Sequence, residues 1–161
     1  MELTHVFGEL VERLRQKKPV VHAITNYVTA ESCADVALAA GASPVMADEP
    51  GEVEEITAGA DALVLHLGSS SFNRLIAMER AVAVAKRKGI PVVLDPVGVM
   101  ASKMRLNFAL QLLNKGYIDI VRGNFSECNA LLTGSTGGHG VDNLEGDTEE
   151  GVALKVAKEA A

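Results

Sequence analysis

The sequence predicts an α/β fold with a mainly parallel sheet covered by helices. Helical and strand-like segments alternate along its 161 residues, and this alternation is typical of parallel strands that are joined by helices. The strand-like segments are almost continuous apolar runs, which favours strands buried on both faces. Apolar residues make up 48% of the chain and charged residues 22%, so a hydrophobic core is expected and intrinsic disorder is not.

The first part of the chain predicts two helices and two strands. Residues 4–17 carry apolar side chains at helical spacing and predict an amphipathic helix. The apolar run 19–24 predicts a buried strand. A second helix is expected from Thr29, its N-cap, to Gly41, where a glycine lets the helix end. Residues 43–46 are expected to form a short strand or an extended segment.

The rest of the chain repeats this alternation. A short helix is expected to begin near residue 52, and residues 72–88 predict a long helix whose basic last turn and following Gly89 suit a helix C-terminus. The other expected elements are the strands 61–67, 90–94 and 118–121 and the helices 103–114 and 126–132. Residues 155–161 continue a helical pattern to the last residue, and we therefore expect the chain to be cut short there.

The composition argues against several classes of function. Acidic residues outnumber basic residues by 21 to 15, which gives a net charge of −6 and disfavours binding to nucleic acids or anionic membranes. The longest uncharged apolar run, residues 36–47, is too short to span a bilayer. The two cysteines lie far apart and form no metal-binding spacing, as is usual in a reducing compartment. We expect a cytoplasmic protein with no nucleic-acid partner and no membrane partner.

Charged residues follow the ends of two predicted strands, where parallel sheets bind ligands. Asp95 is suited to hold Mg²⁺ and equally suited to cap a helix. Arg122 is suited to bind phosphate, because its guanidinium is planar and always charged. Glu127 follows Ser126, a candidate N-cap, so it could serve a metal or the helix dipole. Together with Asn124, these residues indicate a metal–phosphate site more than a set of separate caps.

Three other features are interpreted as structural. The glycine-rich segment 134–140 is not followed by Lys-Ser or Lys-Thr, so a P-loop is rejected and a surface loop is favoured. His22 and His66 lie inside apolar strands and are expected to be hydrogen-bonded core histidines. Met46, taken by itself, predicts a core residue.

Several segments, taken together, resemble the hydroxyethylthiazole kinase family, thiamine-salvage enzymes with the ribokinase-like fold. The segments are VHAITNYVT (21–29), GASPVMA (41–47), ALVL (62–65), GIPVVLDPVG (89–98), VRGN (121–124) with the Ser-Glu pair 126–127, and GVD (140–142). The resemblance implies a three-layer α/β/α domain with a mainly parallel sheet. Because the family's later half is missing after residue 142, we expect residues 1–161 to be the N-terminal part of a single ribokinase-like kinase domain.

The resemblance also implies an activity and a substrate site. The family transfers phosphate from ATP, with Mg²⁺, to the hydroxyl of 4-methyl-5-(2-hydroxyethyl)thiazole, and it is homotrimeric. Met46 would contact the thiazole, and Gly68 would allow the substrate to approach closely. Asn26 and Val28 would line the same site from a neighbouring subunit.

The implied ATP and metal sites match the residues already selected at the strand ends. Arg122 and Asn124 would bind ATP, and Asp95 and Glu127 would bind Mg²⁺. The family's glycine-rich anion-hole loop acts on the substrate hydroxyl and is expected beyond Ala161. No catalytic residue is therefore assigned within this chain, and the fragment by itself is expected to be inactive.

Two positions differ from the family pattern, and two alternative functions remain open. His66 stands where the family usually has Asn, and Ser69 stands where it usually has Thr.

One alternative function is that of another ribokinase-like small-molecule kinase, such as a sugar or pyrimidine kinase, or of an ATP-dependent hydrate dehydratase, although GASPVMA argues against these. The other alternative, if the chain truly ends at residue 161, is a non-catalytic binding or assembly fragment.

Overall fold

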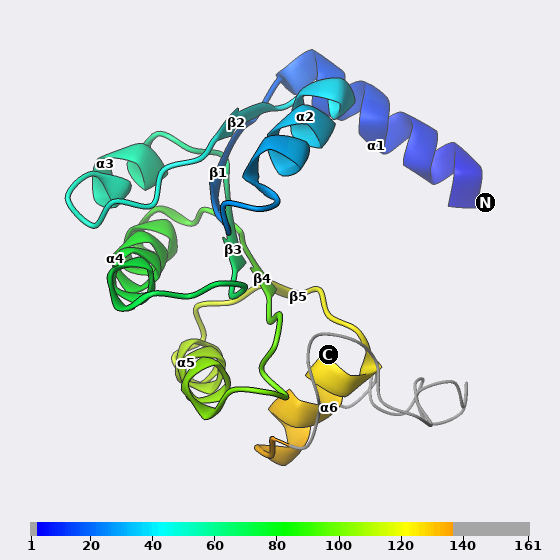
Figure 1. Ribbon diagram of the computed structural model, residues 1–161. Coiled ribbons are helices and arrows are strands. Elements are labelled where there is room, and N and C mark those ends of the chain that lie inside the picture. Colours follow the sequence, from blue (N-terminus) through cyan, green and yellow to red (C-terminus); the bar gives the residue numbers. More distant parts are fainter. Residues whose placement is uncertain (1–2, 137–161) are drawn as a thin grey trace.

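A computed structural model describes residues 3–136 of the chain, and all structural statements below concern this part. Helices and strands alternate, as the sequence predicts (Figure 1). The elements are, in chain order, α1 (Leu3–Lys17), β1 (Val20–Ile24), α2 (Ala30–Ala40), β2 (Ser43–Val45), α3 (Val53–Ala58), β3 (Ala62–His66), α4 (Phe72–Lys88), β4 (Val92–Asp95), α5 (Lys103–Asn114), β5 (Ile120–Val121) and α6 (Phe125–Thr133).

The five strands form one sheet in the order β2-β1-β3-β4-β5, and every pair of neighbours is parallel. The chain crosses over β1 between β2 and β3, so β1 pairs with both of them. This confirms the predicted α/β fold with a parallel sheet. Because all strands point the same way, their carboxyl ends lie together at one edge of the sheet, called the carboxyl edge below, and their starts lie at the opposite, amino edge.

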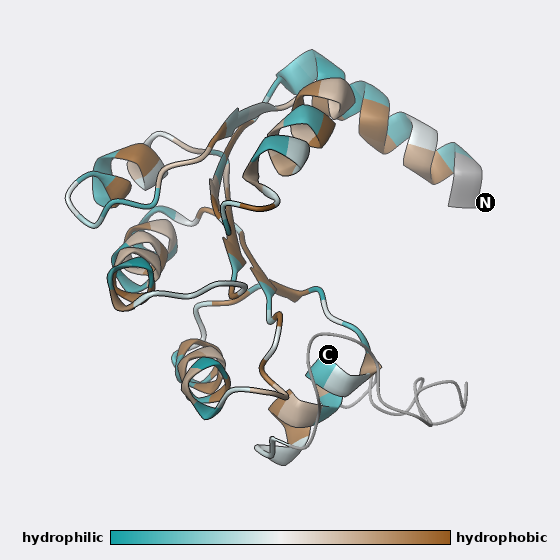
Figure 2. Ribbon diagram, viewed as in Figure 1, coloured by the Kyte–Doolittle hydropathy of each residue, from teal (hydrophilic) through white to brown (hydrophobic). Residues whose placement is uncertain are grey.

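The two faces of the sheet are covered to different extents. Helices α3, α4 and α5 lie along one face (Figure 1), and the strand residues Leu63, Leu65 and Leu94 on that side are fully buried. On the other face α2 packs beside β2, and Figure 1 shows no described helix over β3 and β4 there. Val64 and Val93 on that side are half-buried, although Figure 2 shows the central strands in the brown of hydrophobic residues. Within the described chain, the three-layer arrangement is therefore complete only near α2.

The helix ends agree with the sequence in some places and differ in others. Helix α4 begins at the N-cap Ser71 and is closed by Gly89, which adopts the left-handed conformation that glycine allows. Thr29 is the N-cap of α2, as predicted, but its side chain makes no capping hydrogen bond. The prediction of Ser126 as the cap of the last helix is wrong, because the N-cap of α6 is Asn124.

The amino edge of the sheet is closed by charged side chains that bond to the backbone. The carboxylates of Asp61 and Asp119 accept the N–H groups of Val20 and Val92, at 2.9 and 2.8 Å. Lys86 donates to a backbone carbonyl oxygen at 2.8 Å. The two carboxylate bonds pair the N–H groups with which β1 and β4 begin. In residues 3–136 there is no helix long and apolar enough to cross a membrane.

Candidate active site

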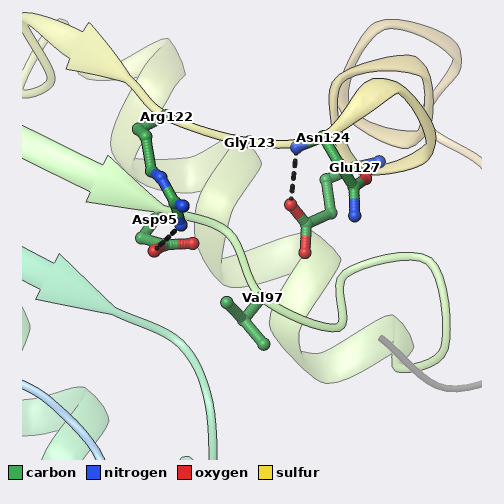
Figure 3. Close-up of a pocket in the computed structure, with 6 residues that line it drawn as sticks. All are labelled: Asp95, Val97, Arg122, Gly123, Asn124 and Glu127. Atoms are coloured by element: carbon green, nitrogen blue, oxygen red, sulfur yellow. Dashed lines mark hydrogen bonds and ion pairs between the residues drawn. The ribbon is translucent and has the colours of Figure 1, made fainter. Parts of the chain in front are cut away.

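An open pocket of about 370 Å³ lies at the carboxyl edge of the sheet, where β4 and β5 end. Six residues line it: Asp95, Val97, Arg122, Gly123, Asn124 and Glu127. Figure 3 shows Asp95 and Arg122 together on one side and Asn124 and Glu127 on the other, with Val97 between them. The four polar residues that the sequence selects for ATP and Mg²⁺ thus surround one space.

Asp95 and Arg122 form an ion pair across two neighbouring strands. Arg122 Nη1 donates to Asp95 Oδ2 at 2.8 Å. The arginine side chain is 76% exposed, whereas that of the aspartate is only 13% exposed. The second carboxylate oxygen, Oδ1, is buried and has no hydrogen-bond partner among the described residues. A buried carboxylate oxygen without a partner is costly, so this oxygen is well placed to bind a cation.

Asn124 and Glu127 form a capping box at the start of α6. The Asn124 side-chain oxygen accepts the N–H of Glu127 at 2.9 Å, and Glu127 Oε2 accepts the N–H of Asn124 at 2.9 Å. A side chain at Gly123 would lie 3.2 Å from Glu127 Oε2, so glycine keeps this turn compact. The Glu127 side chain is nearly buried, and Figure 3 shows its carboxylate at the pocket. The role in the helix start that the sequence left open for Glu127 is therefore confirmed.

The carboxylates around the pocket suit one kind of metal site better than another. In the described part of the chain there is no group of three or more His, Cys, Asp or Glu residues that could hold a metal ion. Mg²⁺ does not need such a group, because it keeps several water ligands and binds through one or two carboxylates and substrate phosphates. Asp95, with its unpartnered oxygen, and Glu127 fit this chemistry.

A second group of predicted site residues lies at the ends of β1 and β3. His66 Nδ1 accepts the N–H of Gly68 at 3.1 Å and lies 3.4 Å from Asn26 Nδ2, while Asn26 Oδ1 accepts the N–H of Thr29 at 3.0 Å. Because an N–H can only donate, Nδ1 is the acceptor in this contact, which fits the neutral tautomer with its proton on Nε2. Burial lowers the pKa of His66, although the negative charge of Asp95 opposes this effect.

His22 and His66, the two histidines of the strands, differ in their surroundings. His22 is fully buried, and its ring bonds to the Thr57 hydroxyl at 2.9 Å and to the Ala47 carbonyl oxygen at 2.8 Å, so the prediction of a bonded core histidine is confirmed. His66 is only half-buried, because it ends β3 on the sparsely covered face. Its ring lies so close to Gly68 that a side chain at this position would collide with it, which gives this glycine a structural reason of its own.

The remaining predicted substrate residues lie in different surroundings within the described part of the chain. Met46 lines a small cavity of about 40 Å³ beside Tyr27 and Asp48. Asn26 is buried, and its amide is held by its own chain. Val28 is 86% exposed and contributes to neither cavity.

Sequence reasoning missed two residues near the Met46 cavity. Arg74 is nearly buried and forms an ion pair with Asp48 at 2.8 Å. In the sequence the arginine reads as one polar position of an amphipathic helix, and no motif connects it with an acidic residue 26 positions earlier. The signal was therefore absent, because the pairing depends on how the β2–α3 loop folds against the start of α4.

The fold and the pocket together define a class of protein. A parallel α/β sheet whose carboxyl edge carries an arginine, a helix N-terminus and two carboxylates is an arrangement for binding a phosphorylated ligand. The profile of the "Hydroxyethylthiazole kinase family" matches residues 11–161. The chain belongs to this family.

Individual relatives agree with this assignment. The chain is 41% identical over 160 residues to the hydroxyethylthiazole kinase of Ruminiclostridium cellulolyticum. This match covers 99% of this chain and 59% of that protein. It is 42% identical to the hydroxyethylthiazole kinase of Pyrococcus horikoshii over 95% of this chain and 57% of the relative. A solved structure of hydroxyethylthiazole kinase from P. horikoshii superimposes with a TM-score of 0.79 at 38% identity, over 94% of this chain and 56% of that one. The chain thus spans less than two thirds of the length of these relatives.

Proposed function

We propose that this protein phosphorylates the hydroxyl group of 4-methyl-5-(2-hydroxyethyl)thiazole with ATP, as a step of thiamine salvage. The single observation that carries the proposal is the pocket at the carboxyl edge, where an exposed arginine lies beside a carboxylate oxygen that has no partner among the described residues. Such a pair can receive a phosphate together with its cation. The name shared by the relatives supports this choice of substrate.

In this proposal two of the pocket residues bind the ATP phosphates and two bind the metal. Arg122 and Asn124 bind the phosphates, and the guanidinium of Arg122 is exposed and able to turn toward them. Asp95 and Glu127 hold Mg²⁺, which offsets phosphate charge when it is bound. Positioning and charge stabilisation supply most of the catalysis in phosphoryl transfer, so these residues matter although none of them bonds covalently to the substrate.

The transfer itself joins the two groups of site residues. The bond between the γ-phosphorus and the oxygen that bridges it to the β-phosphorus breaks, a bond from the γ-phosphorus to the alcohol oxygen forms, and the alcohol proton is released. Met46, Asn26 and Gly68, at the ends of β2, β1 and β3, would orient the alcohol. We assign no residue in the described chain to accept the proton.

We further propose that the described strands belong to a single kinase domain that assembles as a homotrimer in the cytoplasm. Tyr27 and Val28 are 79% and 86% exposed, and such apolar side chains on a surface suit an interface between subunits. Val28 is thus free to reach a neighbouring subunit's thiazole site. Asn26 is better suited to act within its own subunit, because its amide is already bonded there.

A coupled assay of ADP release tests this function on protein produced from the complete coding sequence. With ATP and Mg²⁺ we expect turnover of the thiazole alcohol, and a kcat/KM at least about tenfold lower for ribose, pyridoxal and hydroxymethylpyrimidine. Turnover of one of these without the thiazole would instead favour another ribokinase-like kinase. ATP binding without any turnover would favour the non-catalytic alternative, and light scattering would test the trimer.

A further inference from the structure

Arg74 is a buried arginine that lies outside the ATP pocket. It belongs to the first turn of α4, and its side chain is only 4% exposed. Its Nε and Nη2 donate to Asp48 Oδ2 at 3.1 and 2.8 Å, and its Nη1 donates to the carbonyl oxygen of Ser69 at 2.8 Å. Each nitrogen of the guanidinium therefore has a partner, as the burial of a charge requires.

The same guanidinium also contacts an aromatic ring. Its central carbon lies 4.6 Å from the centre of the Tyr27 ring, and a cation at this distance is attracted to the face of the ring. Arg74 thereby joins three loops at the carboxyl edge. It holds the β1–α2 loop through Tyr27, the β2–α3 loop through Asp48 and the β3–α4 loop through Ser69.

Each of these three loops carries a residue of the proposed alcohol site, namely Asn26, Met46 and Gly68 in turn. Two of the residues that the arginine holds, Tyr27 and Asp48, also line the cavity beside Met46. That cavity is about 40 Å³, far smaller than the roughly 300–1,000 Å³ of pockets that hold drug-sized ligands. Small displacements of the loops therefore decide how much of an alcohol substrate can enter.

A purely structural role at the start of α4 does not account for these bonds. The helix is already capped, because the Ser71 hydroxyl accepts the backbone N–H of Arg74 at 3.2 Å. Ser69 has a φ of 52°, a left-handed conformation that is uncommon for serine, and its carbonyl is the one that the guanidinium holds. The side chain thus acts on the loops rather than on the helix.

We infer that Arg74 is a positioning residue of the alcohol site: its guanidinium fixes the three loops relative to one another and so sets the affinity for the thiazole alcohol without contacting ATP. The inference rests on the proposed function, because it takes the residues of the alcohol site from there. It adds a determinant of substrate affinity that acts from beneath the site.

The test compares Arg74→Lys with Arg80→Lys in protein made from the complete coding sequence. Arg80 is a matched control: it lies on the same helix and donates to the Pro50 carbonyl of the same β2–α3 loop, at 2.9 Å, but it is exposed. Lysine cannot replace a fork that bonds to two groups at once. We expect KM for the thiazole alcohol to rise about tenfold in Arg74→Lys, since small misplacements can cost up to about a hundredfold.

The readouts separate positioning from general loss of structure. KM for ATP is expected to change less than about twofold, because the ATP pocket keeps its own contacts. Calorimetric titration with the thiazole alcohol in the absence of ATP should show the same tenfold loss. The Arg80→Lys variant should match the wild type in all three measurements.

A surface variant keeps the inference testable if the buried substitution prevents folding. Tyr27→Leu removes the ring over Arg74 and should raise KM for the alcohol about threefold, whereas Tyr27→Phe keeps the ring face and should raise it less. An unchanged alcohol KM in Arg74→Lys, or equal losses for alcohol and ATP, would overturn the inference while the kinase function stands. A wild-type protein that neither binds nor phosphorylates the thiazole alcohol would overturn the proposed function, and this inference with it.

Discussion

The two edges of the sheet use their charged residues in different ways. At the amino edge, Asp61 and Asp119 bond to backbone N–H groups of neighbouring strands, and Lys86 bonds to a carbonyl oxygen. At the carboxyl edge, Asp95 has an oxygen without a partner among the described residues, and Arg122 is mostly exposed. Charges at the first edge stabilise the fold, and charges at the second remain able to bind a ligand.

Both edges of the sheet carry a cavity. A second cavity, of about 210 Å³, lies at the amino edge and is lined by Lys86 and Asp119 among others. Its two charged groups are already bonded to the backbone. They are therefore less able to form new hydrogen bonds or ion pairs with a ligand. The comparison teaches that the presence of a cavity does not by itself mark the functional edge, whereas bonding capacity left over after folding does.

The largest expected effect is the loss of activity in Asp95→Asn. An amide is a poorer ligand for Mg²⁺ than a carboxylate, so kcat/KM should fall about a hundredfold, or about 2.7 kcal/mol, and the Mg²⁺ dependence should weaken. Asp61→Asn is the matched control at the amino edge, where an amide oxygen can still accept the Val20 N–H. If both variants keep wild-type activity and a normal Mg²⁺ titration, the two edges do not differ as described.

Asp119→Ala, at the amino edge, is expected to lower stability and to leave activity unchanged. This change leaves the N–H of Val92, which is 1% exposed, without its side-chain partner, and an unsatisfied buried group costs about 1–3 kcal/mol. Urea denaturation should show this loss, while kcat stays near the wild-type value. Asp119→Asn keeps an acceptor oxygen and should restore most of the stability. An active-site effect of Asp119→Ala without a stability effect would contradict the comparison.

A smaller effect on ligand binding is expected from Arg122→Lys. Lysine keeps the charge but lacks the planar fork, so KM for ATP should rise about tenfold, equivalent to about 1.4 kcal/mol. The free energy of unfolding should hardly change, because the side chain is 76% exposed. Steady-state kinetics at saturating alcohol measures the effect, with Lys86→Met as the amino-edge control. A wild-type KM for ATP in Arg122→Lys would exclude this role in phosphate binding.

The smallest expected effect is a pH dependence of stability that arises at His22, inside strand β1 and between the two edges. Burial lowers its pKa from the ordinary value of 6.5. As the pH falls below about 6.5, His22 therefore binds a proton in the unfolded chain but not in the folded chain. The free energy of unfolding then decreases toward acid pH by up to about 1.4 kcal/mol per pH unit. Urea denaturation at pH 7 and pH 5.5 measures this slope.

His22→Gln provides the control for that slope. Its amide nitrogen can still donate to the Ala47 carbonyl oxygen, which the ring bonds at 2.8 Å, but it does not titrate. The slope between pH 7 and pH 5.5 should therefore be smaller in the variant. An equal slope in both proteins would assign the pH dependence to other groups.

The parts of the site that could be predicted follow from strand direction. Asp95 and Arg122 come directly after apolar runs, and in a parallel sheet such residues must share an edge. The capping role of Asn124 could also have been found, because Glu127 follows three residues later in the pattern of a capping box; Ser126 was a plausible cap only when considered without that partner. Here the sequence held the signal, but the prediction named Ser126 and did not consider Asn124 as the cap.

Other features depend on tertiary contacts that leave no pattern in the sequence. Arg74 and Asp48 meet only because the β2–α3 loop folds against the first turn of α4. The last strand was expected over 118–121 but pairs only at Ile120–Val121, since the end of a strand is decided by its neighbour and not by its own apolar residues. Sparse cover over β3 and β4 likewise could not be read from strands whose residues are apolar on both sides.

The parallel pairing of every described strand has a consequence for how fast this part of the chain can fold. Parallel neighbours cannot be joined by a tight turn, so Val20 pairs with Ser43, and Val21 pairs with Ala62. Each pairing must close a long loop before its hydrogen bonds form, and that closure costs entropy. Folding is therefore expected on a scale of milliseconds to seconds rather than microseconds. Because β1 pairs with both β2 and β3, neither pairing can form before β1 is in place, and substitutions in β1 should slow refolding more than substitutions in β5.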